Sequence, residues 1–181
     1  RFGNTAGFRY VIGLRYRLIP YLYSEYMKAA LRGEMMFRPL AFDYPDDKYA
    51  AQVEDQLLLG NELMLAPVYE QNASGRYVYL PEDMMLVRFR EDGSMQTEIC
   101  QAGHQYIDVA LTDVVFFLRP DTMIPLAGPA QCTQEIDFDH LEYLKYVRDE
   151  MATYEYYHDA GYGKDYDNPE HISILFSTTE E

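Results

Sequence analysis

The sequence lacks several things that whole classes of protein need. It has no Trp, two Cys and four His in 181 residues, and only 15 Lys and Arg against 30 Asp and Glu. The formal net charge of −15 repels a phosphate backbone, so a nucleic-acid partner is disfavoured. No apolar run is long enough to cross a bilayer, so we expect no membrane partner.

The cysteines give little support for a disulfide framework or a metal site. Cys100 and Cys132 are well separated, so two free thiols in a reducing compartment are expected, with a single disulfide as the alternative. No signal peptide opens the sequence, and we expect a cytoplasmic protein. The first residue is Arg1 rather than Met, so the chain is expected to be part of a longer one. The triplet beginning at Asn72 fits the N-glycosylation pattern, which also arises by chance.

What the sequence does have is a folded globule's composition, with 48% hydrophobic residues, and a strong helical period near its start. Steps of three and four predict one long helix from Phe8 to Arg32, kinked at Pro20 and stopped by Gly33. Two apolar stripes on this helix each need a packing partner. One stripe contains Ile12, Tyr16, Ile19, Tyr23, Tyr26 and Ala30; the other contains Leu14, Leu18, Tyr21 and Leu22.

Beyond Gly33 the period changes to two, which predicts an antiparallel β-sandwich of short strands. The run Leu63–Ala66 predicts a strand buried on both faces. A weaker boundary near residues 126–130 separates a smaller distal β unit. The proximal strands are expected at 35–42, 62–68, 76–80, 84–90, 95–100, 104–110 and 114–118, and the distal ones at 134–138, 154–158 and 172–176.

The acidic residues form no recognisable catalytic pair. Adjacent carboxylates point to opposite sides of an extended chain, so doublets such as Asp46-Asp47, Glu54-Asp55 and Glu91-Asp92 are expected to lie in turns or on the surface. Hydrolysis of a glycosidic bond with retention needs two carboxyl groups about 5–5.5 Å apart. No nucleophilic elbow and no phosphate-binding glycine loop is present.

Metal and cofactor sites are not indicated either. The histidines, His104, His140, His158 and His171, are too far apart for a local ligand pattern. The acidic residues Asp159, Asp165, Asp167 and Glu170, near Gly161 and Gly163, faintly suggest a calcium loop, but their spacing favours an acidic hairpin. The sequence therefore predicts no catalytic residue, no cofactor-binding residue, no metal ligand and no cofactor.

A series of segments along the chain carries a resemblance to a known family. The segments are 14–23 (LRYRLIPYLY), 37–47 (FRPLAFDYPDD), 54–68 (EDQLLLGNELMLAPV), 77–81 (YVYLP), 117–125 (FLRPDTMIP) and 154–161 (YEYYHDAG). Together they resemble glycoside hydrolase family 31, the α-glucosidase and α-xylosidase family. The first segment is similar to the family's last barrel helix, and those after it follow the family's order through its C-terminal sandwich to its distal hairpin. The strand expected at 84–90 departs from the family by having no Trp, and Ala160 stands where an acidic residue is usual.

The resemblance implies a mainly β region behind one long N-terminal helix, which ends a (β/α)8 barrel. It implies residues 1–44 as the barrel end, 45–127 as a proximal β-sandwich and 128–181 as a distal β domain. Family members are retaining enzymes whose catalytic Asp residues and substrate-binding His precede this helix. No position of this sequence matches them, so the chain alone is expected to be inactive.

The resemblance thus implies the supporting C-terminal region of a retaining α-glucosidase that removes terminal non-reducing glucose. Its partners would be the rest of the (β/α)8 catalytic domain, the α-glucoside substrate and a possible second copy of itself. Two alternatives stay open: a carbohydrate-binding β-sandwich without catalysis, which an exposed coplanar Tyr pair would favour, and a dimerisation or structural domain. The choice between glucosidase and xylosidase is also left open.

Overall fold

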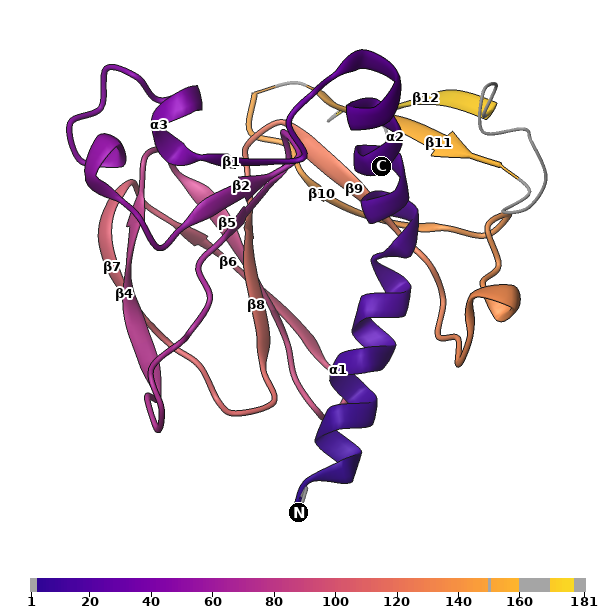
Figure 1. Ribbon diagram of the computed structural model, residues 1–181, viewed down its shortest axis with the longest axis horizontal. Coiled ribbons are helices and arrows are strands. Elements are labelled where there is room, and N and C mark those ends of the chain that lie inside the picture. The colour runs from indigo at the N-terminus through magenta and orange to yellow at the C-terminus, as the bar shows by residue number, and fades with distance from the viewer. Residues whose placement is uncertain (1–2, 150, 160–169, 178–181) are drawn as a thin grey trace. The chain divides into compact units, whose positions relative to one another are not determined.

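A computed structural model describes residues 3–149, 151–159 and 170–177 (Figure 1). The chain forms two compact units, each built from two stretches of sequence. The first unit contains Arg1–Val11 and Phe37–Pro120, and the second contains Ile12–Met36 and Asp121–Glu181. The described residues are mainly β, in largely antiparallel sheets with three α-helices, which confirms the predicted fold class at this level.

The predicted single helix is two helices, α1 (Thr5–Arg17) and α2 (Ile19–Arg32), separated at Leu18. Pro20 explains the break, because it cannot donate a hydrogen bond to the preceding turn and its ring crowds that turn. The chain still turns helically here, since the amide of Leu22 donates to the carbonyl of Leu18 over 2.9 Å. The stop signal is confirmed: Gly33 has φ 71° and its amide donates to Ala29 over 3.0 Å.

The first unit is a sandwich of a six-stranded and a two-stranded sheet. Alternate residues of the small sheet, such as Val78, Leu80 and Ile107, point into a core that they share with Met84 and Phe117 of the large sheet. The large sheet, in spatial order, is β1 (Phe37–Pro39), β2 (Leu57–Leu59), β3 (Leu63–Leu65), β8 (Val114–Leu118), β5 (Met84–Phe89) and β6 (Met95–Cys100); the small one is β4 (Gly75–Leu80) and β7 (Gly103–Asp108).

The strand expected at 35–42 is corrected by the structure. Strand β1 ends at Pro39, and the one-turn helix α3 (Leu40–Asp43) follows directly. Pro39 has no amide hydrogen with which to extend the ladder, and its φ of −62° starts the helical turn instead. A second short turn, η1 (Ala50–Gln52), leads into β2, which the sequence pattern did not identify as a strand.

The second unit contains a four-stranded sheet with two antiparallel pairs joined by one parallel contact, Thr153 opposite Thr122. The strand expected at 134–138 is wrong, because the short turn η2 (Thr133–Glu135) occupies its start. Residues 122–126, expected with the proximal sandwich, pair in this sheet; the domain division of the longer protein stays a prediction. The strands, in spatial order, are β10 (Glu142–Tyr146), β9 (Thr122–Leu126), β11 (Met151–His158) and β12 (Glu170–Ser177).

Helix α2 is fastened to β11 of the same unit through buried polar groups. The amide of Tyr157 donates to Ser24 Oγ over 3.0 Å. Lys28 Nζ lies 2.5 Å from Glu25 Oε1, and the hydroxyl of Tyr154 donates to the same carboxylate oxygen over 2.9 Å. Because Glu25 and Lys28 are each only 3% exposed, each charge is stabilised by the other instead of by water. The contact therefore fixes one face of α2 on the sheet.

The apolar stripe that contains Ile12 and Tyr26 is partly exposed to solvent, as expected of a helix surface whose packing partner is absent. Ile12 is 52% exposed and Tyr26 is 60% exposed, whereas Tyr21 on the opposite stripe is fully buried. Exposed apolar side chains in a row along a helix are typical of a surface that packs on other protein.

Strand β3 corrects one sequence-based expectation about burial. Leu63 and Met64 are buried, but Leu65 is only partly buried, so the strand is not covered equally along its length.

We expect Leu63→Ala to lower the free energy of unfolding by about 2–5 kcal/mol, because it leaves a cavity in a close-packed site. Leu65→Ala serves as the matched control and should cost clearly less. Urea unfolding of both variants measures this, and equal losses would contradict the burial difference.

Candidate functional site

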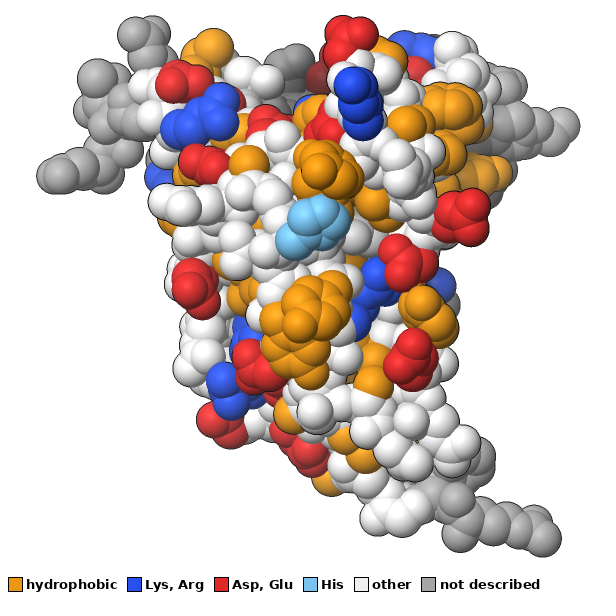
Figure 2. All heavy atoms as spheres, turned by 90° about the vertical axis from the view of Figure 1, so that its left-hand side faces the viewer, with side chains coloured by type: hydrophobic (Ala, Val, Ile, Leu, Met, Phe, Trp, Pro, Cys, Tyr) orange, Lys and Arg blue, Asp and Glu red, His pale blue; other side chains and the backbone are white. Residues whose placement is uncertain are grey.

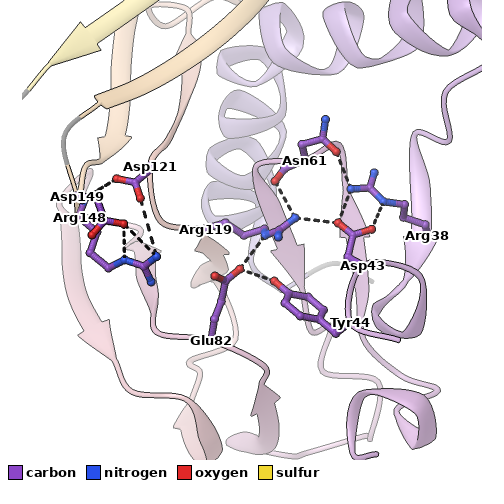
Figure 3. A network of polar contacts seen from close by, with 9 residues as sticks. All are labelled: Arg38, Asp43, Tyr44, Asn61, Glu82, Arg119, Asp121, Arg148 and Asp149. Carbon is purple, nitrogen blue, oxygen red and sulfur yellow. Dashed lines mark hydrogen bonds and ion pairs between the residues drawn. The ribbon is translucent and has the colours of Figure 1, made fainter. Parts of the chain in front are cut away.

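The most connected polar site of the first unit is a charge network centred on Asp43 (Figure 3). Arg38 makes a bidentate contact with the carboxylate: Nε lies 2.6 Å from Oδ1 and Nη2 lies 2.8 Å from Oδ2. Arg119 Nη1 donates to Oδ2 over 2.9 Å. One carboxylate thus bridges two guanidinium groups, and the paired geometry with Arg38 is the strong form of this interaction.

Arg119 also carries the network to a second carboxylate. Its Nε donates to Glu82 Oε1 over 3.0 Å, and the hydroxyl of Tyr44 donates to the same oxygen. The guanidinium carbon lies 5.3 Å from the centre of the Tyr44 ring, within cation–π range. Asn61 completes the network, because its side-chain oxygen accepts from Arg38 over 2.7 Å and its carbonyl accepts from Arg119 over 3.2 Å.

These residues come from separate elements, so the network joins parts of the unit that are distant in sequence. Arg38 lies in β1, Asp43 ends α3, and Arg119 follows β8. Asn61 lies in the turn between β2 and β3, where Gly60 has φ 63°, and Glu82 lies between β4 and β5. The left-handed backbone at Gly60 turns the chain sharply enough to present Asn61 to both arginines.

The electrostatics of the network are unsuited to proton transfer near neutral pH. The hydrogen bonds and charge of Arg38, with the charge of Arg119, outweigh burial and hold the pKa of Asp43 below its ordinary value of 3.8. Burial, together with the hydrogen bond to Glu82, raises the pKa of Tyr44 far above its ordinary range. A general acid or base needs a pKa near the working pH. The network therefore suits structural fixation and not acid–base chemistry.

The second unit has a smaller polar site at Asp121, the first residue of that unit's second stretch of sequence. Its Oδ1 accepts the backbone amides of Arg148 over 2.8 Å and Asp149 over 2.9 Å. These hydrogen bonds outweigh the opposing effect of burial and lower the pKa of Asp121. Asp121 has φ 57°, a left-handed conformation that Asp tolerates better than most residues. The carboxylate thus fixes the turn before β11.

The carboxylate doublets lie in turns and ion pairs, as expected. Asp47 Oδ1 accepts the amide of Tyr49 over 2.8 Å, and its Oδ2 accepts the hydroxyl of Tyr79 over 2.6 Å. Asp92 accepts the amide of Ser94 over 2.8 Å in the turn at Gly93. In each case a short side chain stabilises a backbone turn.

The histidines are spread over both units. His104 lies on β7, and His140 pairs with Asp137 through Nδ1 and Oδ2 over 2.9 Å. His158 on β11 and His171 on β12 are one register position apart in the β11–β12 ladder. Among the described residues no group of three or more His, Cys, Asp or Glu is placed to hold a metal ion. Asp165 and Asp167, for which an acidic hairpin was expected, lie outside the described residues.

Two further observations concern the cysteines and the helices. Cys100 and Cys132 are both free, which confirms the expected pair of thiols. Within the described ranges, no helix combines the length and the apolar character needed to span a membrane.

Sequence reasoning missed an exposed aromatic face on the small sheet of the first unit. Tyr77 lies opposite Tyr106 in the β4–β7 ladder and Tyr79 lies opposite His104. Since Val78 and Leu80 point inward, strand alternation turns the tyrosines outward. Figure 2 shows hydrophobic side chains and a histidine gathered on the face that carries these strands.

The leading pair on this face is not a flat platform. Tyr77 is 73% exposed and Tyr106 is 54% exposed, but their rings meet edge to face at 71°, with centroids 5.1 Å apart. The coplanar Tyr pair that would favour a simple carbohydrate-binding platform is therefore not what this pair forms.

The first unit is thus a β-sandwich whose segments are joined by a polar network, and comparisons with known proteins give its family. Residues 33–124 match the model of the glycosyl hydrolase family 31 C-terminal domain. All residues of the first unit's network fall within this range. The chain belongs to glycosyl hydrolase family 31 and is part of its C-terminal region.

Individual relatives agree with this assignment. The chain is 32% identical to a lysosomal alpha-glucosidase of Bos taurus over 154 residues, covering 78% of this chain and 16% of that protein. It is 25% identical to alpha-glucosidase 2 of Bacillus thermoamyloliquefaciens over 164 residues, covering 90% of this chain and 20% of that protein. The chain therefore spans about a fifth or less of these relatives.

Solved structures share the fold. A family 31 dextranase of Flavobacterium johnsoniae, in complex with glucose, is 27% identical and superimposes with a TM-score of 0.72. The match covers 91% of this chain and 20% of the dextranase chain.

The network generates a prediction about pH. Because the pKa of Asp43 is lowered on folding, its ion pairs stabilise the folded state above pH 3.8 and lose this effect as the pH falls through the folded-state pKa. We expect Asp43→Asn to lower the free energy of unfolding by about 1–3 kcal/mol at pH 7, and by progressively less as the pH falls below 3.8. Urea unfolding at neutral pH and at a series of acidic pH values measures the difference. The exposed Asp46→Asn is the control, and a loss at Asp43 that does not vary with pH would contradict the argument.

Proposed function

We propose that this chain is the supporting C-terminal region of a retaining α-glucosidase, which removes terminal non-reducing α-linked glucose. The observation that carries the proposal is the network of Arg38, Asp43 and Arg119, which fixes the segments of the first unit and has no group poised for proton transfer. The relatives named alpha-glucosidases support the choice of activity. The catalytic carboxylates then lie upstream of this chain.

The supporting role follows from how enzymes use rigid neighbours. A catalytic arrangement works only when the elements around it hold it within fractions of an ångström. The network joins five segments of the first unit, which are strands, turns and a helical turn. It therefore resists displacement of any one of them. The first unit thus supplies a stiff body against which the catalytic domain can be fixed.

The partner that fits the open helix surface is the rest of the (β/α)8 barrel, with α1 and α2 as its last helical layer. Ile12 is 52% exposed and Tyr26 is 60% exposed, so this stripe needs an apolar partner. The relatives are several times longer than this chain, and the part of each relative that lies outside the match is long enough to contain such a domain.

The first test asks whether this chain carries activity itself. The purified chain should release no p-nitrophenol from p-nitrophenyl α-glucoside, whereas the protein expressed with its complete sequence should. The physical reason is that hydrolysis with retention requires a carboxyl pair, which we place upstream. Turnover that follows the isolated chain through purification, or a complete protein that is inactive on α-glucosides, would count against the proposal.

The second test separates a supporting role from substrate contact. In the complete protein, Arg119→Met leaves Asp43 and Glu82 without a shared cation and should lower the melting temperature by several degrees. The fraction that remains folded should keep a near-normal KM, since no substrate contact is lost. The exposed Lys48→Met is the matched control for losing a positive charge. A raised KM with unchanged stability would instead place Arg119 at the substrate.

A further inference from the structure

One feature of the first unit that its supporting role does not explain is a hollow beside β4 and β7. Its volume is about 530 Å³, within the range of small-ligand sites. It lies between the aromatic face of the small sheet and the loop that follows β3. The side chains that matter are Asp55, Tyr69, Asn72, Arg76, Tyr77 and Tyr106.

The sides of the hollow are aromatic and open to solvent. Tyr69 is 69% exposed and Tyr77 is 73% exposed, so large parts of both ring surfaces face water. The edge-to-face contact with Tyr106 restricts the orientation of the Tyr77 ring. Both rings line the hollow, and the C–H face of one sugar ring can pack against such a surface.

The floor of the hollow is polar and held in place. Arg76 Nη2 lies 2.5 Å from Asp55 Oδ2, and Arg76 Nη1 donates to the carbonyl of Pro67 over 2.7 Å. The hydroxyl of Tyr69 donates to Asp55 Oδ2 over 3.3 Å, and the guanidinium carbon lies 5.6 Å from the Tyr69 ring centre. Because these contacts use Oδ2, Oδ1 of Asp55 is placed to accept a hydroxyl.

The charges of the hollow select a neutral ligand. The positive charge of Arg76 is balanced by Asp55, Glu70 adds a negative charge to the lining, and the chain as a whole carries −15, so anions are repelled. Aromatic faces beside carboxylate, guanidinium and amide groups match a pyranose, which has apolar C–H faces and a rim of hydroxyls. We propose that this hollow binds a short stretch of neutral oligosaccharide made of α-linked glucose. The choice of α-linked glucose rests on the proposed function, whereas the preference for a neutral sugar rests on the hollow alone.

The test is native gel electrophoresis of the complete protein through a gel containing soluble amylopectin. The wild-type protein should be retarded relative to a gel without polysaccharide. Tyr77→Ala and Tyr106→Ala should each weaken this retardation, with an apparent dissociation constant raised roughly 3- to 10-fold. Tyr49→Ala is the matched control, because Tyr49 is 60% exposed on the same unit but does not line the hollow. Circular dichroism and melting temperature confirm that each variant is folded.

The outcomes separate this proposal from the preceding one. Retardation that depends on Tyr77 and Tyr106 in a protein inactive on p-nitrophenyl α-glucoside supports the hollow and removes the proposed function. An active protein whose retardation is unaffected by both variants overturns the hollow. Equal weakening by Tyr49→Ala, or retardation only in a gel of hydroxyethyl cellulose, also overturns it. So does a change of oligomeric state in Tyr77→Ala, seen by sedimentation, without a change in retardation, because the face would then serve a protein contact.

Discussion

The first unit depends on one constraint: the guanidinium of Arg119 is shared between the carboxylates of Asp43 and Glu82. The Arg119 side chain is only 20% exposed, so its charge must be stabilised by protein groups rather than by water. The strand that precedes Arg119 therefore determines where α3 and the turn before β5 can lie. Arg38 extends this constraint to the edge of the sheet, because it donates to both carboxylate oxygens of Asp43.

This constraint gives a physical reason for the family resemblance. The segments that resemble the family supply most residues of the network, including Arg38, Asp43, Asn61 and Arg119. A substitution at any of them leaves a partly buried charge or polar group without its partner. Fixation of this kind holds the surrounding elements still.

Local signals were enough to predict much of the fold. Gly33 ended its helix because left-handed backbone suits glycine, and alternation identified β4 through β8 closely. The errors in assigning strands to sheets come from long-range pairing. Residues 122–126 pair with β10 and β11, and no residue close to them in sequence indicates this. The network also could not be derived from spacing, since Asp43 and Arg119 meet only after folding. The exposure of Tyr77 and Tyr106 was missed because alternation along a strand does not tell which of its two faces meets solvent.

The buried contact of Glu25, Lys28 and Tyr154 has a consequence for the order of folding. In this chain, α2 precedes the strands of the first unit, and the strand β11 that covers its charged pair follows them. Such contacts between distant parts of the chain form late and slow folding. A newly made helix α2 therefore keeps its ionic pair in water until the strands of the first unit and β11 have all been made.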